Sequence, residues 1–389
     1  VHVHFIGIGG ISMSGLAEVL LEERFTITGS DMKESSLTKK LEQSGATVFY
    51  GQSAEHILPG TDVVVYTAAV HEDNPEYQEA VRQQIPLLSR AELLGQMMNN
   101  YEQSVAVAGT HGKTTTTSMV TQILLAADAD PTISVGGILP SIGGNIRVGH
   151  SSCFVTEACE YTNSFLHFYP KYSMILNIEE DHMDFFKDLD DIRHSFRLFA
   201  QNTASDGAVI VNREIKGLDQ LLEGLSRDII TYGFDPSCDF YPQDITFHES
   251  GCAHFSLMHR KKQTALDTQG TNTVSFSAWT EVEKICDIRL CVPGRHNISN
   301  ALAAAALAVQ MGIPAASICE GLHEFHGTDR RFQYKGMCGQ ATVIDDYAHH
   351  PTEIRATLSA AAGYPHNRII CVFQPHTYTR TKAFLKEFA

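Results

Sequence analysis

Residues 109–115, Gly-Thr-His-Gly-Lys-Thr-Thr, have the residue types of a loop that binds phosphate groups. Gly112 permits a tight turn whose backbone N–H groups face an anion, Lys113 brings a point charge to the outer phosphates, and Thr114 offers a hydroxyl to Mg²⁺. The full pattern G-x-x-x-x-G-K-[ST] requires glycine at position 107, which is valine here. An apolar, strand-like segment nevertheless precedes the loop, and a helical pattern follows it. We therefore expect a bound nucleoside triphosphate rather than an ordinary turn with an incidental lysine.

A second glycine turn, residues 7–10 (Gly-Ile-Gly-Gly), follows the first apolar segment of the chain. The dinucleotide-binding pattern G-x-G-x-x-G requires glycine at position 12, which is Ser12 here. Asp31 lies about 20 residues further on, at the end of the next predicted strand, where an acid that binds a ribose is expected. NAD, FAD or a UDP-sugar would each fit this turn, and a tight turn without a ligand is the alternative interpretation.

Acidic residues and a histidine lie at or just after the carboxyl ends of two later predicted strands: Glu157, Glu160, Glu180, Asp181, His182 and Asp184. Ligands of open α/β sheets collect at the carboxyl ends of the strands. Carboxylates beside a bound triphosphate can hold Mg²⁺, which prefers oxygen ligands. Each acid alone could be a solvated loop residue, but their common place at neighbouring strand ends favours a metal site.

Two asparagines, Asn297 and Asn300, lie three residues apart at the start of a predicted helix and so share one face of it. They could contact an adenine or a ribose, or Asn297 could instead cap the helix. A further polar set gathers near the C-terminus: Arg330, Arg331, Asp345, Asp346, His349, His350, His376 and Arg380. Arginines at strand ends can clamp a phosphate or a carboxylate, which we favour over a surface cluster without a ligand.

The elements that carry these residues alternate between strand and helix, the pattern of a parallel, doubly wound sheet. Strands are predicted at 25–31, 46–51, 61–70, 104–109, 151–159 and 172–178, with helices at 11–23, 35–45 and 114–127. Short alternating segments between about 238 and 292 predict antiparallel strands that extend one edge. Further strands are predicted at 341–350 and 368–376.

Changes in this pattern divide the chain into three domains, which we place at residues 1–101, 102–323 and 324–389. The chain ends within a predicted helix, "TKAFLKEFA", so we expect the third domain to be incomplete here.

Charge and cysteine usage limit the functional classes. The net charge of −16 argues against a nucleic acid or a membrane surface as partner, because both need a basic surface. No apolar run approaches the ~20 residues of a membrane span, and no basic leader precedes the first strand. The nine cysteines are unpatterned, which is typical of reduced thiols in a cytoplasmic protein.

The motifs together resemble the Mur ligase family. The matching stretches span nearly the whole chain in the family's order: "HFIGIGGISMSGLAEVL", "GTHGKTTT", "NIEEDHMD", "PGRHNISNALAA", "RRF", "DDYAHHPTE" and "QPHTYTRT". The family's loop reads G-T-x-G-K-T-T, so valine at position 107 is normal for it. The resemblance implies an α/β fold with a Rossmann-like N-terminal domain for a UDP-sugar. It also implies a central P-loop ATPase-type domain with a mixed sheet and a Rossmann-like C-terminal domain for an amino acid.

The resemblance also implies the activity, an ATP- and Mg²⁺-dependent ligase of peptidoglycan biosynthesis. The branch with "GIGGISMSG" joins L-alanine to the lactyl carboxylate of UDP-N-acetylmuramate through an acyl phosphate. A second branch of the family recycles a murein peptide onto the same UDP-sugar, and it stays the alternative. Thr377 stands where arginine is usual in "QPHRYTR", which weakens the case for a second cation near the alanine carboxylate.

The resemblance assigns residues to each substrate. It places at ATP Gly109, Thr110, His111, Gly112, Lys113, Thr114, Thr115, Asn297, Asn300, Arg331 and Asp346. It places at the UDP-sugar Gly9, Gly10, Ser30, Asp31, Arg90, Glu92 and Asn145. It places at the amino acid His349, His376 and Arg380, and at the metal Thr114, Glu157 and His182. The implied catalytic residues are Lys113, His182, His349 and Arg380.

Two other classes of protein remain as alternatives. A nicotinamide-dependent dehydrogenase would explain the first glycine turn but would leave the phosphate loop at 109–115 without a role. A nucleotide-gated regulator without chemistry of its own would leave the acidic and histidine clusters without a role.

Overall fold

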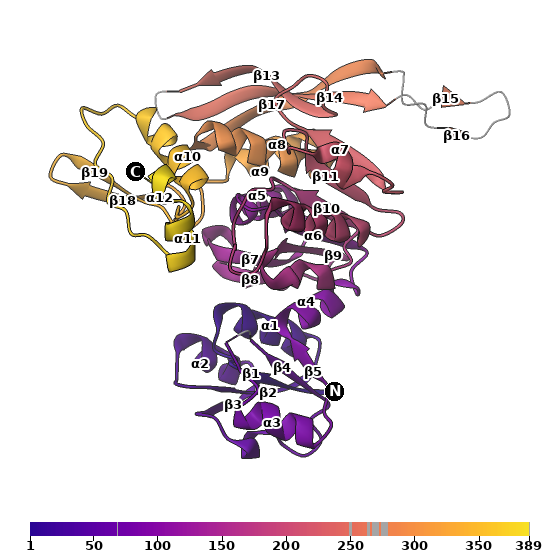
Figure 1. The fold of residues 1–389 in the computed structure, drawn as a ribbon. Helices are drawn as coiled ribbons and strands as arrows, with labels where there is room; N and C mark the ends of the chain where they lie inside the picture. The colour runs from indigo at the N-terminus through magenta and orange to yellow at the C-terminus, as the bar shows by residue number, and fades with distance from the viewer. Residues whose placement is uncertain (68, 249–250, 263–264, 267–271, 274–278, 389) are drawn as a thin grey trace.

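The computed structural model describes residues 1–67, 69–248, 251–262, 265–266, 272–273 and 279–388. Three units follow one another along the chain (Figure 1). The N-terminal unit lies at one end of the central unit, and the C-terminal unit lies at its side. This arrangement confirms the expected three-domain α/β architecture with a mixed central sheet. The exact boundaries proposed above stay predictions.

The N-terminal unit is a five-stranded sheet in the order β3-β2-β1-β4-β5, and all of its strand pairs are parallel. Its elements are β1 (His2–Ile6), α1 (Ile11–Glu22), β2 (Thr26–Asp31), α2 (Ser36–Gln43), β3 (Thr47–Tyr50), η1 (Ala54–His56), β4 (Val63–Tyr66), α3 (Pro75–Arg82), β5 (Leu87–Ser89) and α4 (Arg90–Met98). The strand order reverses beside β1, and in such sheets that crevice is where ligands bind.

The central unit is a ten-stranded sheet in the order β17-β14-β13-β12-β11-β10-β6-β9-β7-β8. Its first half comprises β6 (Gln103–Ala108), α5 (Lys113–Ala126), β7 (Thr132–Leu139), η2 (Pro140–Ile142), β8 (Gly144–Arg147), β9 (Cys153–Ala158), η3 (Tyr161–His167), β10 (Tyr172–Ile175) and α6 (Leu189–Gln201). Its second half comprises β11 (Ala208–Asn212), α7 (Leu218–Leu222), β12 (Asp228–Tyr232), β13 (Phe240–Phe247), β14 (Cys252–Lys262), β17 (Trp279–Pro293), α8 (Arg295–Gln310) and α9 (Ala315–His323). A separate short pair is formed by β15 (Ala265–Leu266) and β16 (Asn272–Thr273).

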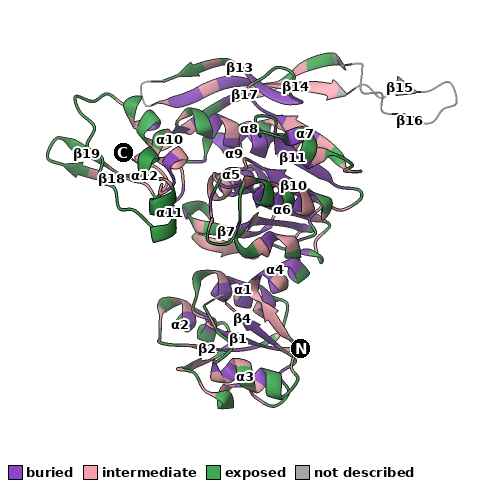
Figure 2. Ribbon diagram, viewed as in Figure 1, coloured by how far each residue is buried: buried purple, intermediate pink, exposed green. Residues whose placement is uncertain are grey.

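The middle strands of this sheet are parallel, and β13, β14 and β17 form an antiparallel extension, as the sequence pattern predicts. The side chains of strand β6 explain its place in the middle of the sheet. Val105 and Val107 pack into the core beneath α5, α8 and α9, whereas Ala106 and Ala108 pack into the core on the opposite face. Both faces are therefore dry, and Figure 2 shows the resulting buried layer. The end of β6 is held rigidly where the phosphate loop begins.

Two helical glycines bring the first two units into close contact. A Cβ on Gly15 of α1 would lie 1.8 Å from the Cδ1 atom of Ile146 on β8. A Cβ on Gly95 of α4 would lie 2.1 Å from the backbone oxygen of His167. A clash at Gly95 could not be relieved by a change of rotamer, because the atom that the Cβ would meet belongs to the backbone of His167.

We therefore expect Gly95→Ala to destabilise the protein by about 1–3 kcal/mol, the cost of overpacking. The sign is the informative part, because alanine in a helix interior normally stabilises by about 0.5–1 kcal/mol relative to glycine. Urea unfolding measures the difference. Gln96→Ala, at the exposed neighbouring position, serves as the control and should change stability by less than about 0.5 kcal/mol. A Gly95→Ala protein as stable as the wild type would contradict this account of the contact.

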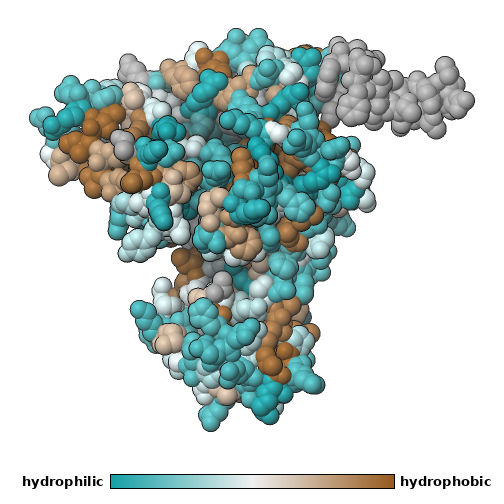
Figure 3. Space-filling model, viewed as in Figure 1, coloured by the Kyte–Doolittle hydropathy of each residue, from teal (hydrophilic) through white to brown (hydrophobic). Residues whose placement is uncertain are grey.

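The C-terminal unit comprises β18 (Gln333–Cys338), β19 (Ala341–Asp345), α10 (Pro351–Ala362), α11 (Tyr378–Ala383) and α12 (Leu385–Phe388). Strands β18 and β19 pair antiparallel, and Figure 3 shows apolar side chains over them; the exposed ones include Tyr334, Met337 and Val343. The strand predicted at 368–376 does not form. A β-strand needs a hydrogen-bonded neighbour, and none of the described strands pairs with this segment.

No helix in the described part of the chain combines the length and apolarity needed to cross a bilayer.

Candidate active site

The phosphate loop connects β6 to α5. Gly109 and Gly112 have φ angles of 148° and 82°, in the region that favours glycine. The loop after β10, the strand that pairs with β6, fixes this turn through Asn177. The backbone N–H of His111 donates to Asn177 Oδ1 at 2.7 Å, and that of Thr110 donates to the Asn177 carbonyl at 3.2 Å. The N–H groups that start α5 have no acceptor within the helix. They remain available to an anion at the positive end of the helix.

Lys113 lies half-buried under this loop. Its Nζ atom is 2.9 Å from Glu160 Oε2 and also donates to the carbonyls of Gly109 and Thr110. Burial disfavours the charged ammonium, but the Glu160 carboxylate outweighs it, and the pKa of Lys113 is raised. The lysine is therefore charged and held at the loop, as contact with phosphate oxygens requires.

Glu157, at the end of β9, reaches the first turn of α5. Its Oε2 accepts a hydrogen bond from Thr114 Oγ1 at 3.1 Å, and its Oε1 accepts from the Gly136 N–H on β7. Burial raises the pKa of Glu157 despite these donors and the nearby Lys113. The ionised carboxylate is thus poorly solvated, a state that a bound cation would relieve.

His182 occupies the loop after β10. Its ring stacks on Tyr161 with centroids 4.5 Å apart, and its Nε2 is 3.9 Å from both Glu160 Oε1 and Asp181 Oδ2. Glu160 Oε1 is buried and has no hydrogen-bond partner among the described residues. Thr114, Glu157 and His182 line one cavity, and hydroxyl and carboxylate oxygens are among the ligands that Mg²⁺ prefers. The residues present therefore fit the metal that the family resemblance implies.

The asparagines on α8 lie beside the loop. Asn300 Oδ1 would be 2.8 Å from a Cβ placed on Gly112, and Asn300 Nδ2 donates to Asn297 Oδ1 at 3.1 Å. The helix cap is Gly294, without a side-chain capping bond, and Asn297 Nδ2 donates to the Pro293 carbonyl. The alternative interpretation of Asn297 as the N-cap is therefore wrong.

A cavity of about 540 Å³ is lined by residues of all three units, and the predicted residues in its lining come from the central and third units. Those in its lining are Thr110, His111, Gly112, Lys113, Thr114, Asn145, Glu157, Asp181, His182, Arg330, Arg331 and His349. A smaller cavity of about 290 Å³ shares Asp181, His182 and His349 with it and adds Asp184, His376 and Arg380. The predicted residues outside both linings are Gly9, Gly10, Ser30, Asp31, Arg90, Glu92, Gly109, Thr115, Glu160, Glu180, Asn297, Asn300, Asp345, Asp346 and His350.

Residues of the C-terminal unit close these cavities. Arg380 is buried, and its Nη2 and Nε atoms lie 2.8 Å and 3.1 Å from Asp181 Oδ1. Burial disfavours ionisation of Asp181, but His182 and Arg380 outweigh it and lower the pKa of Asp181. Asp346 accepts from the N–H groups of Phe332 and Ala348, so its carboxylate shapes its own loop.

The first glycine turn is joined to the end of β2. The Gly9 N–H donates to Asp31 Oδ2 at 2.8 Å, whereas the Ser30 hydroxyl points inward and donates to buried Glu76 at 2.6 Å. Glu92 caps its own helix by accepting from the Ser89 N–H, and Arg90 is the first residue of that helix. Asn145 Nδ2 reaches the carbonyl of Ile11 at 3.5 Å, across to the N-terminal unit.

Two acidic residues at the site went unassigned in the sequence analysis. Glu179 and Glu353 both lie beside His111, at 3.5 Å and 3.3 Å between the paired atoms. Glu353 stands in "HHPTE", where the structure forms a helix-capping box. That local pattern was the available signal, although it indicates a helix start and not a contact between units.

This fold and site are those of one enzyme family. Residues 2–102 match the Mur ligase family catalytic domain, residues 107–308 the Mur ligase middle domain, and residues 330–389 the Mur ligase glutamate ligase domain. The chain belongs to the Mur ligase family. This membership removes the basis for the dehydrogenase and regulator alternatives.

Within the family, the chain is 60% identical over 389 residues to the UDP-N-acetylmuramate–L-alanine ligase of Agathobacter rectalis, covering all of this chain and 80% of that protein. It is 53% identical to the enzyme of the same name from Lachnospira eligens, with the same coverage. The structure of UDP-N-acetylmuramate–alanine ligase from Thermotoga maritima is similar at a TM-score of 0.75 and 30% identity, covering 98% of this chain and 83% of that one. The structure of a murein peptide ligase from Psychrobacter arcticus is similar at a TM-score of 0.74 and 28% identity, covering 92% of this chain and 75% of that one.

Proposed function

We propose that this chain is an ATP-dependent ligase that joins L-alanine to the lactyl carboxylate of UDP-N-acetylmuramate, a step of peptidoglycan synthesis. The observation that carries the proposal is the cavity where the phosphate loop, the acid at the end of β9 and polar residues of the third unit meet. The relatives named for this reaction, at up to 60% identity, support the choice of substrates.

The chemistry explains why these parts must meet. A carboxylate is a poor electrophile, so its oxygen first attacks the γ-phosphorus of ATP, which gives an acyl phosphate and ADP. The amine of L-alanine, having lost a proton, then attacks the carbonyl carbon. The tetrahedral intermediate collapses to the amide and expels phosphate. Positioning and charge neutralisation account for most of the rate in such transfers.

We assign the first step to the phosphate loop. Lys113, charged and held beside Glu160, neutralises the outer phosphates, and the N–H groups of α5 bind their oxygens. Thr114, Glu157 and His182 would hold Mg²⁺. When bound, that ion neutralises phosphate charge. We assign Asn300, which lies next to Gly112, and its partner Asn297 to the adenosine side of the nucleotide.

We assign the sugar and the amine to the two flanks of the larger cavity. Gly9, Gly10 and Asp31 bind the UDP group at the switch point of the N-terminal sheet, and Asn145 lies on the way to the phosphate loop. His349 and His376, around the smaller cavity, are the candidates for the amino acid. Arg380 already pairs with Asp181, so its part is to position the loop that carries His182.

A substrate screen tests the proposal. Purified protein is given ATP, Mg²⁺ and UDP-N-acetylmuramate with L-alanine, with a murein tripeptide, or with no amine. We expect phosphate release and a new amide, detected by mass spectrometry, with L-alanine. Amide formation with the tripeptide alone would replace the proposal by the peptide-recycling activity. Phosphate release at the same rate with and without the UDP-sugar and the amine would overturn the proposed ligase activity altogether.

A further inference from the structure

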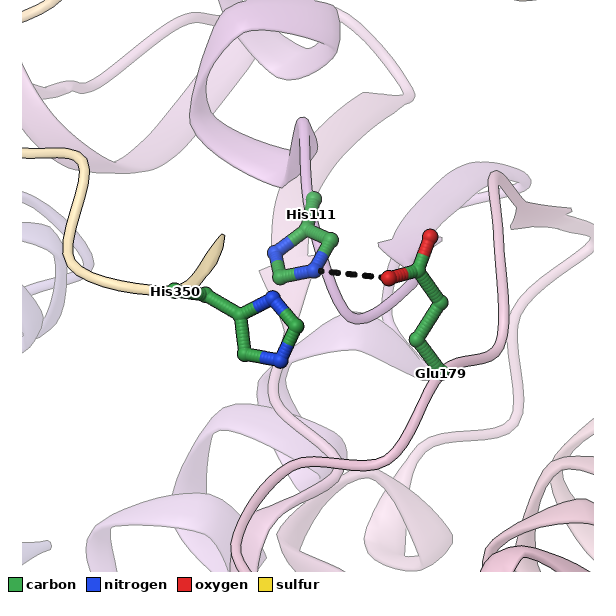
Figure 4. Close-up of side chains that lie close together, drawn as sticks. All are labelled: His111, Glu179 and His350. Carbon is green, nitrogen blue, oxygen red and sulfur yellow. Dashed lines mark ion pairs between the residues drawn. The ribbon is translucent and has the colours of Figure 1, made fainter. Parts of the chain in front are cut away.

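The side chain of His111 lies between two carboxylates that come from different units. Its Nε2 is 3.5 Å from Glu179 Oε2, on the loop after β10, and its Nδ1 is 3.3 Å from Glu353 Oε1, on α10 of the third unit. Figure 4 shows the Glu179 pair and the ring of His350 beside that of His111. The His111 side chain is thus turned toward the third unit, while its backbone N–H is bound by Asn177.

Other contacts join the third unit to the central unit around this histidine. The His350 ring lies 4.6 Å from the His111 ring, and its Nε2 donates to the Glu180 carbonyl at 3.1 Å. Thr352 Oγ1 donates to Glu179 Oε2 at 2.6 Å. The first turn of α10 therefore docks on the phosphate loop and the β10 loop together.

The charges in this contact are matched. Burial disfavours a charged His111, but Glu179 and Glu353 outweigh it and raise the pKa of His111 to about 9. Glu353 is half-buried, and although desolvation disfavours its charge, His111 and Arg331 hold its pKa below the usual range. The ring of His350 faces that of His111, and burial and the charge of His111 lower the pKa of His350, so it is neutral. At neutral pH a cation of the phosphate loop thus bridges two anions, one in each unit.

A metal ion is the alternative occupant of this cluster. Ligand atoms of His111, Glu179 and His350 lie within 4.8 Å of one another, and His111 Nε2 has no hydrogen-bond partner in the described part of the chain. However, a metal bound at His111 Nε2 would have to displace the proton that faces Glu179. It would also compete with the Thr352 hydroxyl for Glu179. The ion-paired imidazolium accounts for these contacts without an added ion.

We propose that His111 is a positioning residue that couples the phosphate loop to the docking of the third unit through Glu353 and Glu179. Occupation of the loop by ATP then favours the docked third unit, and docking favours ATP by the same factor. The proposal deepens the proposed function, since docking brings His349 and His376 to the reacting carboxylate. The docking itself can be measured without any turnover.

Hydrogen exchange of the α10 amides, residues 351–362, tests the coupling. In the wild type we expect a non-hydrolysable ATP analogue to slow this exchange. In His111→Asn we expect exchange without nucleotide to be roughly tenfold faster, because the lost pair shifts the docking equilibrium, and the effect of the analogue to shrink by a similar factor. Unchanged exchange in His111→Asn would overturn the proposal. The nucleotide-free comparison stands even if the proposed ligase activity fails.

Two further variants separate the pair from a folding defect. Glu353→Gln keeps the acceptor for the N–H groups of His349 and His350 but removes the charge, and it should reproduce the His111→Asn exchange. The double variant should be no worse than either single variant, and additive effects would contradict the proposed pair. His259→Asn is the matched control, because His259 Nδ1 lies 3.3 Å from Glu283 on the β14–β17 pair, seven residues along β14 from the end that lies near Ala360 of α10. It should leave α10 exchange unchanged.

A chelator distinguishes the ion pair from the metal. Nucleotide-free wild-type protein is treated with EDTA and then with Zn²⁺. An exchange rate of the α10 amides that neither treatment changes supports the ion pair. Exchange that rises with EDTA and is restored by Zn²⁺ would assign the cluster to a metal and overturn the proposal.

Discussion

Lys113→Met is expected to lower kcat by about 10³-fold or more while binding of UDP-N-acetylmuramate persists. The loss follows from removing the charge that faces the outer phosphates in the transition state, where such charges are most effective. Binding of the UDP-sugar should persist because its glycine turn lies in the N-terminal unit, outside the lining of the cavity around Lys113. Phosphate release measures the rate, and calorimetry with the UDP-sugar measures binding. Loss of both together would contradict the assignment of the two ligands to separate units.

A second substitution removes the structural side effect of this variant. Lys113→Met leaves the buried Glu160 carboxylate without its partner, and breaking a buried pair costs about 3–5 kcal/mol. The Lys113→Met/Glu160→Gln variant should recover much of that stability without recovering activity. Recovery of turnover in the double variant would show that the lysine acts only through the fold.

Glu157→Gln is expected to separate activity from stability in the opposite sense. We expect turnover to fall by about 10²-fold or more, with a higher Mg²⁺ requirement, because a carboxylate of the metal site becomes a neutral amide. Burial raises the pKa of Glu157, so its ionised form at neutral pH weakens the folded state. The amide can still accept from Thr114 and Gly136. Thermal unfolding should therefore show a melting temperature equal to or above that of the wild type.

The pH dependence of this difference gives its control. The wild type should approach the stability of Glu157→Gln as the pH falls through the raised pKa, where Glu157 becomes neutral. A Glu157→Gln protein that is less stable at neutral pH and equally active would mean that the carboxylate serves the fold and not a metal.

Much of the site was predictable because its residues follow the ends of buried strands. The apolar runs of β6 and β9 identify strands of a parallel sheet, and parallel strands bring their carboxyl ends to one edge. That geometry alone places Glu157 beside the loop of Lys113. The antiparallel extension by β13, β14 and β17 was likewise visible as alternation of apolar and polar residues.

The remaining features depend on contacts between segments that local pattern does not encode. Asn297 has the residue type of an N-cap, but Gly294 takes that position because the chain turns there with a φ of 98°. Residues 368–376 have β propensity, yet they find no pairing strand among the described residues. Glu353 reads locally as a capping residue, whereas its contact with His111 joins residues 242 positions apart only once the third unit docks.

The central claim is that the sugar carboxylate is phosphorylated by ATP before the amine captures it, and oxygen transfer tests it directly. UDP-N-acetylmuramate carrying ¹⁸O in both lactyl carboxylate oxygens is converted with ATP, Mg²⁺ and L-alanine. We predict that each amide formed leaves one ¹⁸O in the released phosphate and one in the amide carbonyl. Phosphate without ¹⁸O, formed alongside the amide, would contradict the account.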